Sequence, residues 1–114
     1  MSRRLAASLA ALALLGTAAA SADLPPVQIT IKAQAFMPAE IHVPVGVKVE
    51  LRIDNSDDLP AEFESTDLSR EIVVPAHRQV KVFIGPLDAG RYRFFNDFHQ
   101  EAEGWVVADA APNK

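Results

Sequence analysis

The sequence predicts an all-β protein, a two-sheet Greek-key β-sandwich of seven or eight strands. Between residues 27 and 108, short segments alternate between apolar and polar residues, which is the pattern of strands with one buried face. Turn-forming Gly, Pro, Asn and Asp residues separate these segments, and no segment has the apolar spacing of a helix of three or four turns. Many short strands divided by turns favour a sandwich.

The expected strands are, in order, 27–31, 41–43, 47–54, a short strand at Phe63, 72–74, 80–84, 92–95 and 105–108. Segment 47–54 is the clearest, because its odd-numbered residues are apolar and its even-numbered residues are charged. A turn at 55–60 follows it, since Asn and Asp side chains bond to nearby backbone groups and Pro cannot donate to a strand ladder. Residues 65–71 have room for one helical turn.

The first 22 residues have the pattern of a cleavable secretory signal peptide. Arg3 and Arg4 precede an apolar run, and Ala20-Ser21-Ala22 suits signal peptidase. The apolar stretch 5–15 is shorter than the roughly 20 residues of a membrane-spanning helix. We therefore expect export to the bacterial periplasm, with residues 23–114 forming one soluble domain and no membrane insertion after cleavage. The alternative is an uncleaved signal that serves as an anchor.

The expected mature chain is acidic and has no cysteine. Arg3 and Arg4 are two of the 11 basic residues, so cleavage leaves nine against 15 acidic residues and a formal charge of −6. Such a surface argues against binding nucleic acid or anionic lipid. The absence of cysteine excludes disulfides and thiolate ligands, and with them the cysteine-ligated blue-copper site.

Several spaced motifs resemble those of the cupredoxins. They are Phe36-x-Pro38, Val43-Pro-Val-Gly46, Asn55-Ser-Asp-Asp, Gly90-Arg-Tyr-Arg-Phe, and His99 followed five residues later by Gly104. This resemblance extends over nearly the whole expected mature chain and implies a cupredoxin-like fold.

A narrower resemblance rests on Glu62-Phe-Glu-Ser, Arg70-Glu71, Gly85-Pro-Leu and Phe95-Asn-Asp-Phe-His99. These motifs are similar to the cysteine-free cupredoxin-like proteins of bacterial periplasmic iron-uptake systems of the FtrB and EfeO type. That resemblance implies two partners, a periplasmic iron-binding protein and an oxidase-dependent membrane iron permease.

The resemblance also shows which copper-ligand positions have changed. A blue-copper cupredoxin has histidine, cysteine, histidine and usually methionine at the positions held here by Ala61, Asn96, His99 and Ala102. One ligand of four is present, so the trigonal site of a fast one-electron copper carrier cannot form.

Oxygen donors surround these positions instead. Glu62 and Glu64 lie beside the first position, and Asp97 lies two residues before His99. Carboxylates with one imidazole suit Fe(II), Fe(III), Mn(II) or Cu(II) better than Cu(I). We therefore predict a site for an iron or copper ion made by His99, Asp97 and Glu62, with Glu64 or Met37 in support.

Structural roles are the alternatives for each of these residues. If Phe63 points into the core, Glu62 and Glu64 face outward together and are explained as solvated carboxylates or as ion-pair partners of Arg70. Asp97 is explained as an Asx-type cap of its turn, and Met37 by packing.

The predicted function is that of a periplasmic metal-binding accessory protein of iron uptake, which receives, oxidises or passes on iron between an iron-binding protein and a membrane permease. No catalytic constellation is visible, and ferrous-iron oxidation requires a bound redox metal. Two alternatives stay open. One is a metal-free interaction module that docks through the loop 95–98, and the other is a copper-binding protein that uses Met37 and His99.

Overall fold

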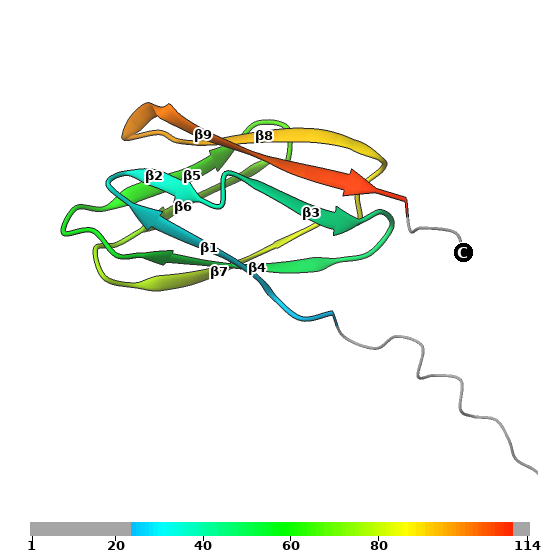
Figure 1. Ribbon diagram of the computed structural model, residues 1–114, viewed down its shortest axis with the longest axis horizontal. Helices are drawn as coiled ribbons and strands as arrows, with labels where there is room; N and C mark the ends of the chain where they lie inside the picture. Colours follow the sequence, from blue (N-terminus) through cyan, green and yellow to red (C-terminus); the bar gives the residue numbers. More distant parts are fainter. Residues whose placement is uncertain (1–23, 111–114) are drawn as a thin grey trace, which may run out of the picture.

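The computed structural model describes residues 24–110, which form nine strands in two packed sheets (Figure 1). The strands are β1 (Val27–Lys32), β2 (Ala35–Met37), β3 (Glu40–Pro44), β4 (Val49–Asn55), β5 (Ala61–Ser65), β6 (Arg70–Val74), β7 (Gln79–Ile84), β8 (Gly90–Asn96) and β9 (His99–Asp109). This confirms the predicted all-β sandwich. The expected signal peptide, 1–22, lies outside the described residues, and within those residues no helix is long and apolar enough to cross a membrane.

One sheet has the strand order β2-β1-β4-β7 and the other β3-β9-β8-β5-β6. The β1–β4 and β3–β9 pairs are parallel, and the remaining pairs are antiparallel. The chain crosses repeatedly from one sheet to the other, for example between β4 and β5 and between β6 and β7. Consequently the outer edges β6 and β7 belong to different sheets although they follow each other in sequence.

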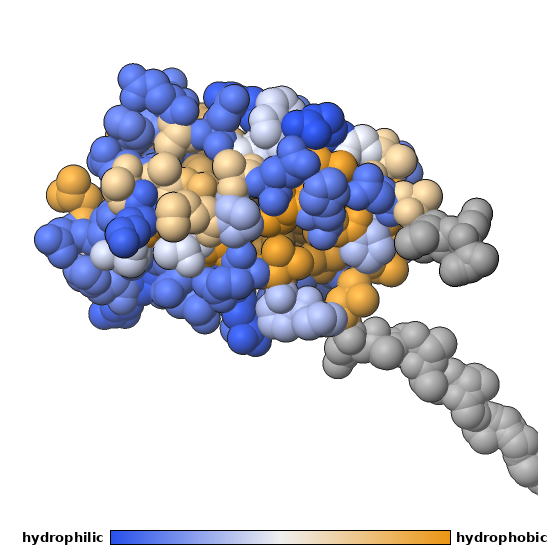
Figure 2. Space-filling model, viewed as in Figure 1, coloured by the Kyte–Doolittle hydropathy of each residue, from blue (hydrophilic) through white to orange (hydrophobic). Residues whose placement is uncertain are grey.

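The core lies between the sheets and contains a cluster of three aromatic rings. Phe36, Phe63 and Phe94 come from β2, β5 and β8, and each is at most 4% exposed. The Phe94 ring centroid lies 4.9 Å from that of Phe36 and 4.9 Å from that of Phe63. Because these strands belong to both sheets, the rings join the two layers. Figure 2 shows hydrophobic residues reaching the surface between β1 and β3, where the sheets part.

Two local expectations were wrong, and one short strand was not predicted. The strand predicted at 47–54 begins at Val49. The chain turns at Gly46, where φ is 77°, and Val47 follows this turn with 38% of its surface exposed. Residues 66–69 form a turn without a helix, held where the Leu68 N–H donates to Ser65 Oγ at 3.0 Å. The ninth strand, β2, has three residues, too few for an alternating pattern to be recognised.

Gly104 on β9 is required by close packing. An added Cβ would lie 2.3 Å from Cζ of Phe94 and 2.7 Å from the carbonyl oxygen of Ala39. We expect Gly104→Ala to lower the free energy of unfolding by about 1–3 kcal/mol, the usual cost of overpacking. Denaturant unfolding of Gly104→Ala, Phe94→Leu and the double variant measures this. The double variant should lose less than the sum of the singles, because a smaller side chain replaces the obstructing ring. Full additivity would contradict this account.

Candidate metal site

Three of the predicted ligands converge on the outer face of the five-stranded sheet. Each of Glu62, Glu64 and Asp97 offers a carboxylate oxygen that lies within 4.8 Å of those of the other two. Phe63 is fully buried, which meets the condition stated above, so strand alternation turns Glu62 and Glu64 away from the core. The three residues are named the carboxylate triad below.

Backbone and side-chain hydrogen bonds place Asp97 next to Glu62. The Asp97 N–H donates to the carbonyl oxygen of Glu62 at 3.0 Å, which ties the β8–β9 turn to β5. The Gln100 side-chain amide donates to Asp97 Oδ1 at 2.7 Å and fixes the direction of that carboxylate. The Asp97 carboxylate also hydrogen-bonds with the carboxyl group of Glu62.

The electrostatics of the triad are unfavourable without a cation. The Glu62 residue is 8% exposed, and burial, followed by the carboxylates of Glu71 and Asp97, raises the pKa of Glu62 to about 7. Burial and then the charges of Asp97 and Glu71 also raise the pKa of Glu64. Both pKa shifts reflect burial first and then the neighbouring carboxylates.

Arg70 does not neutralise this charge. Its guanidinium donates to the carbonyl oxygens of Phe83 at 2.8 Å, Ser69 at 3.0 Å and Leu68 at 3.3 Å. No salt bridge within residues 24–110 involves a member of the triad. The ion pair with Arg70 that was one alternative for Glu62 and Glu64 is therefore not formed.

His99 and Met37 lie outside the triad. His99 is the first residue of β9, where its Nε2 lies 3.2 Å from Glu101 Oε1. It belongs to no group of three or more possible ligands in the described part of the chain. Met37 ends β2 and is 50% exposed. Metal ligation by either residue stays a prediction.

The blue-copper positions do not fit a copper ion. Asn96, at the cysteine position, is fully buried, and its Oδ1 accepts the N–H groups of Glu62 at 3.0 Å and Phe98 at 3.1 Å. This bond to Phe98 also means that Asn96, rather than Asp97, caps the turn. Ala61 and Ala102 are buried and have no donor atom. The cysteine position therefore has a structural role.

Glu71 is a functional candidate that the sequence analysis named only within a motif. It lies directly opposite Glu64 in the β5–β6 register, and its carboxylate reaches that of Glu62. Alternation within β6 places Glu71 on the outer side, but only the strand register shows which residue it faces.

The raised pKa of Glu62 predicts how stability changes with pH. Between pH 4.5 and about 7 the unfolded chain loses the Glu62 proton while the folded chain retains it, so stability falls as pH rises. Glu62→Gln removes this dependence. With a chelator present, we expect the variant to melt several degrees above wild type at pH 8 and close to it at pH 4.5.

Asp54→Asn, on β4 of the other sheet, is the control for loss of one negative charge. Thermal melts of the three proteins at both pH values test the prediction. An equal difference between Glu62→Gln and wild type at the two pH values would refute it.

Comparison with known proteins agrees with the architecture. The chain is 43% identical over 84 residues to the uncharacterized protein RP394 of Rickettsia prowazekii (strain Madrid E), an alignment that covers 73% of this chain and 67% of that protein. Among solved structures, it is similar to a copper(I) form of an amicyanin mutant, with a TM-score of 0.62, 21% identity, and coverage of 80% of this chain and 89% of amicyanin.

It is also similar to the purple cupredoxin of Nitrosopumilus maritimus, with a TM-score of 0.54 and 21% identity over 73% of this chain and 99% of that one. At this level of identity, the two structures show the shared fold alone. The family model described as Cupredoxin-like domain matches residues 5–108. Because that match spans most of the sequence, the chain belongs to the cupredoxin-like domain family.

Proposed function

We propose that this chain is a periplasmic metal-binding protein of iron uptake, which holds iron at the carboxylate triad and passes it between a periplasmic iron-binding protein and a membrane iron permease. The observation that carries the proposal is the convergence of Glu62, Glu64 and Asp97 with no counter-charge among the described residues. Repelling carboxylates cost stability, and a bound cation relieves that cost.

The donor chemistry supports iron over the metals of soft sites. The triad offers only carboxylate oxygens, which favour hard cations, whereas Cu(I) prefers thiolate and thioether sulfur. The motifs Glu62-Phe-Glu-Ser and Phe95–His99, which resemble those of iron-uptake proteins, contain all three members of the triad. The resemblance to iron-uptake proteins and the geometry therefore support the same residues.

The position of the triad suits transfer of an ion. Glu64 on β5 and Asp97 in the β8–β9 turn are half-buried, while Glu62 is buried. A partner's ligands can approach such an ion from the solvent side. The proposal covers binding and transfer of iron, and it assigns no oxidation step, which would need an electron acceptor.

Direct titration tests the metal site. We expect the signal-free protein to bind Fe(III), supplied as its nitrilotriacetate complex, and Asp97→Asn to bind it about 10- to 100-fold more weakly, because a charged ligand is lost. Calorimetry and metal analysis measure both, with Asp54→Asn as a matched control on the other sheet. A wild-type protein that binds neither iron nor copper would contradict the proposal.

His99→Ala and Met37→Leu belong in the same titration. Loss of Fe(III) or Cu(II) binding in His99→Ala would add the imidazole to the site. Cu(I) binding that disappears in Met37→Leu would favour the copper-binding alternative, since thioether sulfur suits Cu(I).

A second candidate function is a metal-free interaction module. Phe98, at the tip of the β8–β9 turn, is 51% exposed, whereas Phe95 is half-buried with the Arg93 guanidinium 4.6 Å from its ring centroid. An exposed aromatic side chain at a turn is suited to docking. Asn96 occupies the cysteine position and has a structural role there, which also fits an interaction module without a metal.

Iron uptake by cells that carry single variants separates the two functions. A docking module predicts that Phe98→Ser lowers uptake severalfold and that Asp97→Asn leaves it intact. The metal-transfer proposal predicts loss of uptake in Asp97→Asn. Unchanged uptake in Phe98→Ser would remove the docking role from this residue.

A further inference from the structure

The β5–β6 pair places two like charges directly opposite each other. Glu64 and Glu71 are register partners on these antiparallel strands, where facing Cβ atoms lie about 4.5–5.5 Å apart. Facing like charges destabilise a sheet, and neither carboxylate forms a salt bridge within residues 24–110. The stability of the fold does not explain why these two glutamates face each other. A cation bound between them would explain it.

A buried side chain independently indicates a ligand at this place. Glu62 is more than nine-tenths buried, and its carboxyl group hydrogen-bonds with the carboxylates of Glu71 and Asp97. The groups that it reaches are the carboxylates of Glu64, Asp97 and Glu71. A buried carboxylate normally has a donor or a cation as its partner, and once these carboxyl groups are ionised none of them can donate to Glu62.

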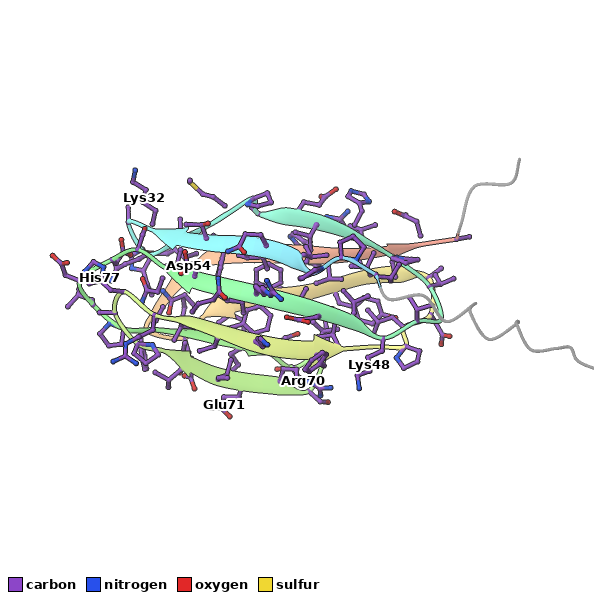
Figure 3. The ribbon with its side chains drawn as sticks, turned by 90° about the horizontal axis from the view of Figure 1, so that it is seen from below. Lys32, Lys48, Asp54, Arg70, Glu71 and His77 are labelled. Atoms are coloured by element: carbon purple, nitrogen blue, oxygen red, sulfur yellow. The ribbon has the colours of Figure 1, made fainter. Side chains whose placement is uncertain are left out.

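Arg70 holds β6 in the position that brings Glu71 to the triad. β6 is an edge strand, paired only with β5, and the Arg70 Nε–H bond to the Phe83 carbonyl joins it to β7 of the other sheet. Figure 3 shows Arg70 turned toward β7 and Glu71, the next residue, pointing away from the ribbon. Glu71 is exposed, so its side chain has the freedom to turn onto an ion held by the triad.

We propose that Glu71 is a fourth carboxylate ligand and that the completed site selects a trivalent, oxygen-seeking cation over a divalent one. This inference rests on the proposed function and specifies its cargo. When all four are ionised, the carboxylates carry four negative charges, and the attraction between ion and ligands grows with the product of their charges. A trivalent ion therefore gains more from each carboxylate than a divalent ion of the same size.

Tb(III) and Ca(II) are suitable probes because they are similar in size, prefer oxygen ligands and differ by one charge. We expect the signal-free wild-type protein to bind Tb(III) at least about 100-fold more tightly than Ca(II) in calorimetric titrations. Glu71→Gln should lower the Tb(III) affinity about tenfold and the Ca(II) affinity by a smaller factor. Asp54→Asn is the control for total charge, and thermal melts verify that each variant is folded.

The possible failures point to different conclusions. If Glu71→Gln binds Tb(III) as tightly as wild type while Asp97→Asn does not, Glu71 is not a ligand and the proposed function stands. If wild type binds both ions equally, or Glu71→Gln weakens both by the same factor, the selectivity is wrong. If wild type binds neither ion and no Fe(III), the site and the proposed function both fail.

Discussion

The fully buried side chain of Asn96 is the interaction on which the site depends. Its oxygen accepts N–H groups from β5 and from the β8–β9 turn, and its Nδ2 donates to the Gln34 carbonyl at 3.2 Å. One amide thus joins three segments that are far apart in sequence. Without it, two buried or partly buried N–H groups would lack an acceptor, and Asp97 would lose its fixed position beside Glu62.

A second side chain, Asp57, stabilises the same end of the sandwich. Its carboxylate accepts the N–H groups of Ala33 and Gln34, both at 2.8 Å, in a turn where both residues have positive φ. Asn55 in turn accepts the Asp57 N–H at 2.9 Å. The end of the fold where cupredoxins hold copper is therefore organised here by side-chain bonds to the backbone, and the carboxylates project from the outer sheet face nearby.

Alternation in the sequence predicted the sandwich, and it turned two triad members outward on the condition that Phe63 is buried. Leu51 and Ile53 are fully buried as their spacing required, and buried Phe63 turns Glu62 and Glu64 outward. Alternation assigns a residue to a face but does not identify its neighbour on the next strand. Asp97 reaches Glu62 through an irregularity at Phe95/Asn96, and Glu71 faces Glu64 through the β5–β6 register. Neither feature has a local sequence signal.

The triad is better explained by binding than by stability. Surface carboxylates that only confer solubility gain from being fully solvated, yet Glu62 is 8% exposed and hydrogen-bonds with other carboxyl groups. A glutamine at that position would remove the charge without changing the shape of the side chain. A docking surface at Phe98 has no use for the buried charge, because Phe98 lies in the turn and Glu62 on the sheet face. Under the proposed function, a bound cation would offset this local destabilisation, and the offset would contribute to its affinity.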